Sequence, residues 1–205
     1  MTITQNLDEL CLDALKEVGN IGAGNAMTSL AIMLDKKVDM SIPRVGVMEL
    51  YEFAQLAGGM ENLAVGVYMP VAGDAPGHIA FILPFDSACH LIDQLMYLPP
   101  GTTQELDEIA CSAILEIGNI LASSYLVALC NLTGLNLLSS PPSLAIDMTA
   151  SILSAVACAF ADMGDKALTI VTQMEEDFGM VEGYFIYVPE PESLHSILRA
   201  LQLEV

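Results

Sequence analysis

The sequence predicts an α/β fold, a pseudo-two-fold duplicated domain in which one antiparallel-rich sheet carries two long helices on one face. Three observations lead to this prediction: an internal repeat, the same order of helical and strand patterns in both halves, and the lack of a Pro/Ser-rich linker between them. We therefore expect a single domain over residues 1–205, built of two related halves at about 1–100 and 101–205.

The internal repeat emerges when the sequence is compared with itself at an offset of 99 residues. Residues 7–23 and 106–122 then share nine identities in 17 positions. The phrase Glu-Val-Gly-Asn-Ile at 17–21 matches Glu-Ile-Gly-Asn-Ile at 116–120. A second match, at an offset of 105 or 106, aligns GHIAFILP with GYFIYVP near the end of each half. The sequence thus predicts two copies of one structural unit.

Each half is expected to begin with a long helix, to continue with three strands and to close with a short helix. The strand segments are rich in Val, Ile, Tyr and Phe, and AGDAPG at 72–77 has the Gly and Pro residues of a turn between two of them. In the first half we expect helices at about 7–34 and 86–96, with strands at 37–49, 63–70 and 77–83. In the second half we expect helices at 106–133 and 192–201, strands at 136–147, 167–174 and 181–188, and an additional helical run at 149–161.

Composition and charge exclude several classes of protein. The chain is 54% hydrophobic, which excludes a disordered chain. It has 26 Asp and Glu residues against six Lys and Arg residues, a formal net charge of −20. Such a surface has no basic footprint for nucleic acid and is repelled by anionic membranes. Partners should offer positive patches, although the acidity could equally serve only to keep a hydrophobic domain soluble.

The sequence predicts no membrane span, leader peptide or metal site. The uncharged stretch 117–146 is interrupted by polar residues and by Pro141-Pro142, so it falls short of the roughly 20 apolar residues that cross a bilayer. The N-terminus, MTITQNLDEL, has neither the basic region nor the early apolar core of a signal peptide. The five cysteines show no CxxC spacing, and the three histidines form no cluster. We expect a soluble, cytoplasmic protein that binds no metal or cofactor itself.

The repeated helix carries polar side chains on one narrow stripe. With 100° between successive residues, each helix has a polar stripe that holds a Glu/Asn pair at positions i and i+3. Apolar residues fall on the opposite side of each helix. The first stripe holds Asp13, Glu17, Asn20 and Gly24, and the second holds Ser112, Glu116, Asn119 and Ser123. Cys11, Leu15, Val18 and Gly22 should face the sheet from the first helix, and Ala110, Ile114, Ile117 and Leu121 from the second.

Two structural interpretations compete with a functional one for these stripes. They could be ordinary solvated helix faces, or Gly19-Asn20 could end the helix and begin a turn. Against this, Asn and Gly are poor helix formers, and the pair is present in both copies while neighbouring positions differ. Glycines beside the pair would also let the surface of another protein come close. The pattern therefore favours two functional ridges.

A Glu and an Asn on an open ridge suit a site that a partner completes. An Asn amide can hold a water molecule by donating and accepting hydrogen bonds, and a carboxylate can pair with a lysine of the partner. Hydrolysis of a phosphoryl group that is already activated on a partner's aspartate needs little more than an aligned water and a positioned substrate. The sequence contains no GxGxxG, GxxxxGK[ST] or GxSxG motif that would indicate another chemistry.

The spacing Asp/Ser-x3-Glu-x2-Asn-x(21–22)-Pro resembles the signature of the CheC/CheX/FliY chemotaxis phosphatases. The first copy runs from Asp13 to Pro43 and the second from Ser112 to Pro141 or Pro142. The segment VGVYMPVAGDAPG at 65–77 is also similar to CheC proteins. The resemblance spans essentially the whole chain, and two intact copies resemble CheC more than CheX, which keeps one site per chain.

The resemblance implies a phosphatase that acts on the response regulator CheY. It implies that Asn20 and Asn119 orient the attacking water and that Glu17 and Glu116 pair with a lysine of the regulator. Asp13 and Ser112 would support them, while Pro43 and Pro142 would be structural and break the chain after the helix. The Mg²⁺ of the reaction would belong to the regulator, and this chain would bind no cofactor.

The alternative is a non-catalytic docking module. Some CheC proteins bind the receptor deamidase CheD, and the FliM-type middle domain shares the fold but lacks the catalytic pair. On this alternative the chain would dock CheD or a flagellar or chemotaxis component without turning over phosphate. A third possibility is a ridge that pairs with itself in a homodimer.

Overall fold

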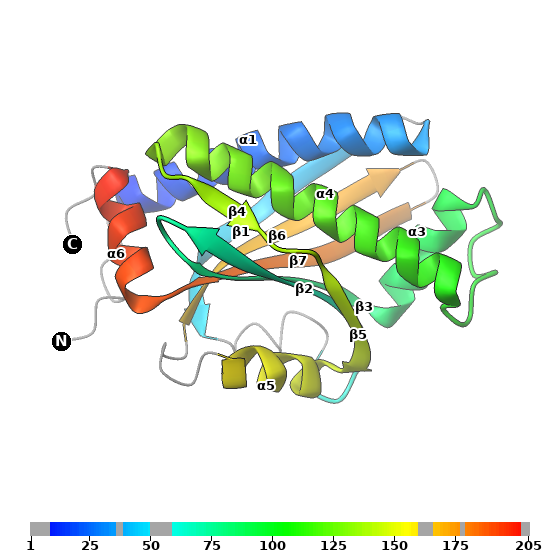
Figure 1. The fold of residues 1–205 in the computed structure, drawn as a ribbon. Helices are drawn as coiled ribbons and strands as arrows, with labels where there is room; N and C mark the ends of the chain where they lie inside the picture. The colour runs from blue at the N-terminus through cyan, green and yellow to red at the C-terminus, as the bar shows by residue number, and fades with distance from the viewer. Residues whose placement is uncertain (1–8, 36–38, 50–58, 160–165, 177–178, 202–205) are drawn as a thin grey trace.

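The computed structural model describes residues 9–35, 39–49, 59–159, 166–176 and 179–201. Two long helices, α1 (Glu9–Leu34) and α4 (Glu108–Thr133), lie side by side on one face of a single sheet, and α5 (Thr149–Ala159) lies on the other face (Figure 1). The shorter helices α3 (Phe85–Leu95) and α6 (Pro191–Ala200) stand at opposite ends of the sheet (Figure 1). The predicted α/β class, with one antiparallel sheet and two long helices on one face, is confirmed.

All strand pairs in the described part of the sheet are antiparallel. The order across the sheet is β1-β6-β7-β3-β2-β4, with β5 also paired to β2. The strands are β1 (Asp39–Glu49), β2 (Leu63–Gly73), β3 (Gly77–Pro84), β4 (Leu137–Ser139), β5 (Ser143–Met148), β6 (Lys166–Glu176) and β7 (Gly179–Pro189).

The pairing is symmetric about the two central strands, β3 and β7, which are the last strands of the two halves of the chain. The first strand of each half pairs with the second strand of the other half, because β1 lies on β6 while β4 and β5 lie on β2. Each half therefore completes the sheet of the other, as one interwoven unit.

One predicted strand is wrong in its extent. The segment 136–147 was expected to be continuous, but it forms the two strands β4 and β5, with residues 140–142 between them. Pro141 and Pro142 have no backbone N–H to give to β2, so the ladder is interrupted there. Ser140 donates its N–H to the Pro70 carbonyl at 2.8 Å as the ladder ends.

Helix α4 has a clear beginning and end. The side chain of Asp107 accepts a hydrogen bond from the Ala110 N–H at 2.8 Å, as an N-cap does. Gly134 follows the last turn with φ of 72°, in the left-handed region, and its N–H donates to the Cys130 carbonyl. Helix α1 spans 26 residues without interruption, so the alternative in which Gly19-Asn20 ends the helix is wrong.

The core fills the space between the sheet and the two long helices. Val67 and Phe81 from the sheet and Ile114 from α4 are fully buried there. Among the residues that the structure describes, α4 alone is long and apolar enough to cross a membrane by length and composition. In this fold it is a core helix, since 56% of its most apolar window is buried inside the protein.

A buried carboxylate fixes the connection between the two halves. Asp93 of α3 is only 1% exposed and accepts hydrogen bonds from the N–H groups of Gly101, Thr102 and Thr103 at 2.7, 3.0 and 2.8 Å. Burial alone would raise the pKa of Asp93, but the hydrogen bonds from Thr103, Gly101 and Thr102 outweigh it and hold the pKa below its usual value. The anchored loop leads directly into α4.

We expect Asp93→Asn to lower the free energy of unfolding by roughly 2–4 kcal/mol, since hydrogen bonds to a charged group are worth about 1.5–3 kcal/mol each and the amide cannot accept all three. The depressed pKa means that this stability is present above the unfolded pKa of about 3.9 and is lost as the pH falls through the folded pKa. Urea unfolding measured from pH 7 to pH 3 should show that the difference in unfolding free energy between the variant and the wild type disappears below about pH 4. Asp86→Asn, at an exposed position in the first turn of the same helix, should cost only about 0.3–1 kcal/mol.

Candidate functional site

The stripe on α1 faces solvent. Asp13, Glu17 and Asn20 are exposed, and Gly24 is half-buried. On the opposite side of the helix Val18 and Gly22 are buried, as the spacing predicts. The side chains of Cys11 and Leu15 lie outside the part of the structure that is described at side-chain level. The helix therefore presents the first Glu/Asn pair on its outer face.

The stripe on α4 repeats this arrangement. Ser112 and Glu116 are exposed, while Asn119 and Ser123 are half-buried. The predicted inner face is buried throughout, and it consists of Ala110, Ile114, Ile117 and Leu121. The two pairs are thus alike in position but differ in exposure, because Asn119 is less accessible than Asn20.

The four side chains of the two pairs are not committed to internal contacts. Among the described residues, the structure shows no hydrogen bond or ion pair from the side chains of Glu17, Asn20, Glu116 or Asn119. Without an internal partner, the carboxylates and amides keep their hydrogen-bonding capacity for another molecule, although Asn119 is only half-exposed.

The first positions of the two motifs differ in their contacts. The Asp13 carboxylate lies 3.5 Å from the Lys16 ammonium, and both side chains are largely exposed, so the ion pair adds little to stability. The Ser112 hydroxyl donates to the Glu108 carbonyl of its own helix at 2.8 Å. Asp13 is therefore paired with a lysine of its own helix, whereas Ser112 is hydrogen-bonded to the backbone of its own helix.

Two of the glycines beside the pairs are required by packing inside the protein. At these two positions the prediction that a glycine admits a partner is wrong. A Cβ at Gly22 would overlap the ring of Tyr125 on α4, and a Cβ at Gly118 would lie 2.8 Å from Cγ1 of Val67 on β2. These glycines let α1 approach α4 and let α4 approach the sheet. Gly24, where a Cβ would meet nothing within 4 Å, keeps the predicted openness.

We expect Gly22→Ala and Gly24→Ala to change stability in opposite directions. The first forces the Tyr125 ring to move and should cost about 1–3 kcal/mol, as overpacked core positions do. The second gains helix propensity without any clash and should add about 0.5–1 kcal/mol. Chemical unfolding of both variants checks this, and equal changes in the same direction would contradict the assigned contacts.

The two prolines of the motifs do not stop the helices. Pro43 lies within β1, where the register with β6 shifts between Ser41 and Arg44. Pro142 lies in the connection between β4 and β5, and α4 has already ended at Gly134. Both prolines interrupt strand pairing rather than terminate a helix.

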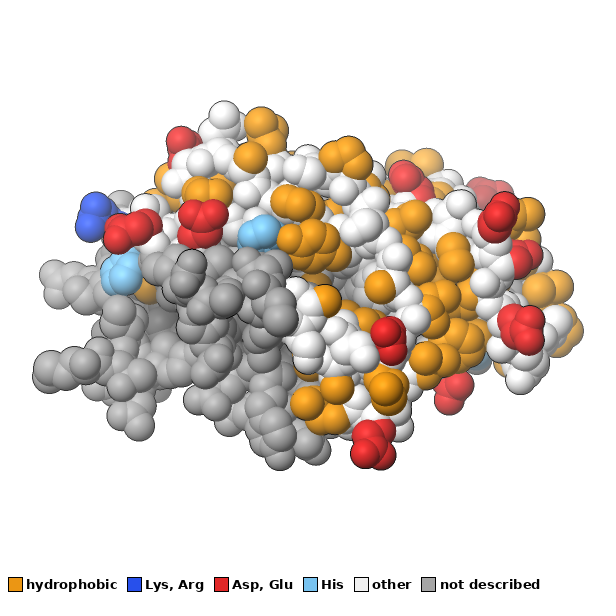
Figure 2. Space-filling model, turned by 60° about the horizontal axis from the view of Figure 1, so that its bottom comes forward, with side chains coloured by type: hydrophobic (Ala, Val, Ile, Leu, Met, Phe, Trp, Pro, Cys, Tyr) orange, Lys and Arg blue, Asp and Glu red, His pale blue; other side chains and the backbone are white. Residues whose placement is uncertain are grey.

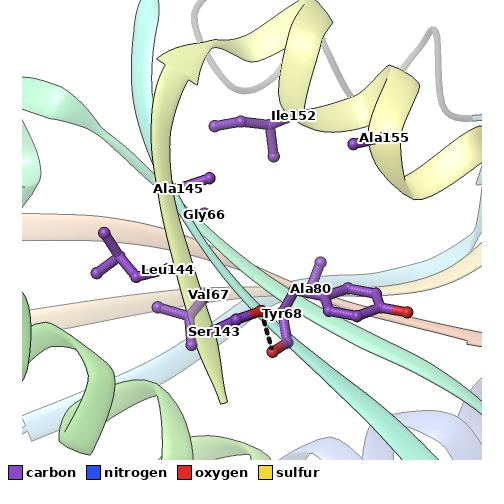
Figure 3. Close-up of a pocket in the computed structure, with 9 residues that line it drawn as sticks. All are labelled: Gly66, Val67, Tyr68, Ala80, Ser143, Leu144, Ala145, Ile152 and Ala155. Carbon is purple, nitrogen blue, oxygen red and sulfur yellow. Dashed lines mark hydrogen bonds between the residues drawn. The ribbon is translucent and has the colours of Figure 1, made fainter.

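The face opposite α1 and α4 carries a pocket of about 290 Å³ between α5 and the sheet (Figure 3). Gly66 of β2 packs against Ile152 of α5, whereas its neighbour Val67 packs against Gly118 of α4, because successive strand residues point to opposite faces. Tyr68 and Ser143 also line the pocket. None of the residues predicted for the site is among its lining residues, so the ridges and the pocket are separate features.

The surface offers little positive charge and no cluster suited to a metal ion. Seen from the side of α5, acidic side chains are scattered among hydrophobic ones, with little Lys or Arg in view (Figure 2). Within the part of the chain that the structure describes, no three His, Cys, Asp or Glu residues are placed to hold a metal ion. The carboxylate and the amide of each ridge are themselves suited to charge pairing and hydrogen bonding with a partner.

Tyr125 was not singled out by the sequence pattern. Its ring lies against Gly22 and also packs on Phe185 of β7, with ring centroids 4.5 Å apart. It therefore fixes how α1, α4 and the sheet meet between the two ridges. Only a contact prediction between positions far apart in the chain could have revealed this role.

Comparisons with known proteins agree with the repeat. The model of the CheC-like family matches residues 10–47 and 109–146, the two segments that contain the motifs. The chain is 32% identical over 205 residues to the CheY-P phosphatase CheC of Bacillus subtilis strain 168, and the match covers 98% of each protein.

Two solved structures share the fold. Thermotoga maritima FliY superposes with a TM-score of 0.77 at 21% identity, covering 98% of each chain. CheX in its complex with CheY, BeF3 and Mg²⁺ from Borrelia burgdorferi superposes with a TM-score of 0.50 at 16% identity, covering 84% of this chain and 97% of that one. At these identities the likeness concerns the fold alone.

Proposed function

The chain belongs to the CheC-like family, and we propose that it is a phosphatase that hydrolyses the aspartyl phosphate of a CheY-like response regulator in chemotaxis. One observation carries the proposal: two matched Glu/Asn pairs face outward from α1 and α4 with no internal partner among the described residues. The 32% identical relative from Bacillus subtilis is itself named as a CheY-P phosphatase.

Each pair supplies one half of an active site that the docked regulator completes. The amide of Asn20 or Asn119 donates to and accepts from a water molecule and aligns it with the phosphorus atom. The water oxygen forms a bond to phosphorus, and the bond from phosphorus to the aspartyl oxygen breaks. The aspartate leaves as a carboxylate with the bonding electron pair, and the phosphate carries away the oxygen and protons of the water.

The carboxylates of Glu17 and Glu116 hold the regulator in place. Each stands three residues before its Asn on the same ridge, so a lysine of the regulator that pairs with the carboxylate brings the acyl phosphate to the amide. The Mg²⁺ that neutralises the phosphoryl oxygens is bound by the regulator in this scheme. Asp13, which is ion-paired with Lys16 of its own helix, supports the first pair from the first position of the motif.

The acidic surface fits this partner. A net charge of −20 favours a partner that presents a lysine or another positive patch, and it speeds their encounter at low salt. Because the substrate is a cytoplasmic type of signalling protein, the proposed location of the chain is the cytoplasm.

The alternative is a non-catalytic docking module for CheD or a flagellar or chemotaxis component, for which the likeness to FliY gives only a shared fold. The two functions are separated by turnover. A phosphatase present at one-tenth of the concentration of the phosphorylated regulator shortens the lifetime of the whole pool, as measured by phosphate release. A docking module at that concentration leaves the lifetime of the regulator as it is in its absence, and this result would remove the proposal.

A further inference from the structure

The two ridges lie on antiparallel neighbouring helices. α1 and α4 run in opposite directions across the same face of the sheet (Figure 1). Gly22 of α1 lies against the ring of Tyr125 of α4, so these two residues are at nearly the same height along the helix pair. This contact fixes where one Glu/Asn pair stands relative to the other.

The separation of the pairs follows from helix geometry. Asn20 stands two residues before Gly22, and Asn119 stands six residues before Tyr125 on a helix that runs the other way. At about 1.5 Å per residue the two amides are about 12 Å apart along the axes, and the two carboxylates about 21 Å apart. With axes about 8–10 Å apart, the pairs lie roughly 15–23 Å from each other.

A strip of surface lies between the two pairs. It consists of Gly24 and Thr28 on α1 and of Ser123 and Val127 on α4, and we call it the central strip. Thr28 is exposed, and Val127 is exposed by 50% although it is apolar. Both helices lie on the same face of the sheet, so the two ridges and the central strip belong to the same helical layer of the molecule.

A protein docked on one ridge covers an area that extends toward the other ridge. A weak or standard interface covers about 600–800 Å² on each partner, which is a disc of roughly 14–16 Å radius. A domain of about 100 residues has a radius of gyration of about 13 Å, and hence a diameter of more than about 30 Å. Two such discs centred roughly 15–23 Å apart overlap on the central strip.

We propose that the two sites exclude each other, so that the chain holds one response regulator at a time and the ridges are alternative docking positions on a shared face. The inference rests on the proposed function, because it takes a regulator as the protein that docks. The duplication then raises the rate of productive encounter without raising the number of regulators bound.

Kinetics distinguish exclusive from independent sites. Glu17→Lys and Glu116→Lys each place a like charge opposite the lysine of the regulator and close one site to docking, at an exposed position where the fold is unaffected. If the sites exclude each other, the wild-type kcat lies between the kcat values of the two variants. The wild-type kcat/KM is then the sum of the kcat/KM values of the two variants. If the sites are independent, the wild-type kcat is the sum of the kcat values of the two variants. A wild-type kcat equal to that sum would overturn the inference while leaving the phosphatase function intact.

Stoichiometry gives a second readout that does not depend on turnover. The chain is titrated with a CheY-like regulator loaded with beryllofluoride and Mg²⁺, a stable mimic of the acyl phosphate, and the complex is measured by native mass spectrometry and calorimetry. We expect saturation at one regulator per chain. Two regulators per chain would refute exclusion alone, whereas no binding at any concentration would refute the proposed function and exclusion together.

Discussion

The Asn20→Ala/Asn119→Ala double variant will fold normally and will lose catalysed phosphate release by about 100-fold or more, a factor typical for removing one positioned hydrogen-bonding group from a transition state. Alanine cannot hold the water on either ridge, although both carboxylates can still dock the regulator. The loss should therefore fall on kcat, with KM nearly unchanged. Phosphate release from the phosphorylated regulator, measured at several regulator concentrations, separates the two constants.

The chain provides a matched control for this variant. Asn25 and Asn131 are exposed asparagines on the same two helices, outside the Glu/Asn pairs. The Asn25→Ala/Asn131→Ala double variant makes the same chemical change twice and should keep the activity of the wild type. If the two double variants had the same kcat, the assignment of water alignment to Asn20 and Asn119 would be wrong.

The long helices and their outer faces could be predicted because the required information is local. A period of 3.6 residues places Ile114, Ile117 and Leu121 on one side of α4, and a 99-residue repeat carries the same reasoning over to α1. Short signals also mark the end of α4, where Gly134 follows the last turn. These features depend on residues within a few positions of one another.

What the sequence could not reveal depends on contacts between distant positions. Gly22 and Gly118 look like openings for a partner until their contacts with Tyr125 and Val67 are known. The two prolines at 141 and 142 are a local signal for a break in 136–147, but the pairing of both β4 and β5 with β2 becomes visible only in the folded sheet. The exchange of strands between the halves is likewise a property of pairing, which periodicity does not encode.

Mutagenesis distinguishes the roles proposed for the individual site residues. Exposure and free hydrogen-bonding capacity show that Glu17, Asn20, Glu116 and Asn119 can meet a partner. They do not separate a residue that aligns water from one that holds the partner, because both tasks require the same accessibility. Kinetic constants do separate them, since alignment acts on kcat and docking acts mainly on KM.

The Glu17→Lys/Glu116→Lys double variant tests the docking role, and its effect should be as large as that of the double Asn variant but of a different kind. Each substitution turns an attraction for the lysine of the regulator into a repulsion, and losing one partner of a desolvated charge pair costs about 2–5 kcal/mol. We therefore expect kcat/KM to fall by roughly 30- to 5,000-fold, with most of the change in KM. Titration with the beryllofluoride-loaded regulator should show the same loss of affinity.

A charge-matched control is needed because the double Glu variant also makes the chain less acidic. Glu105→Lys/Glu192→Lys makes the same change at exposed positions outside both ridges. Long-range attraction is screened within about 8–10 Å at physiological salt, so this control should alter the association rate at low salt and little else. If it weakened binding as much as the ridge variant does, the −20 charge as a whole would hold the regulator, and neither carboxylate would have the specific role assigned to it.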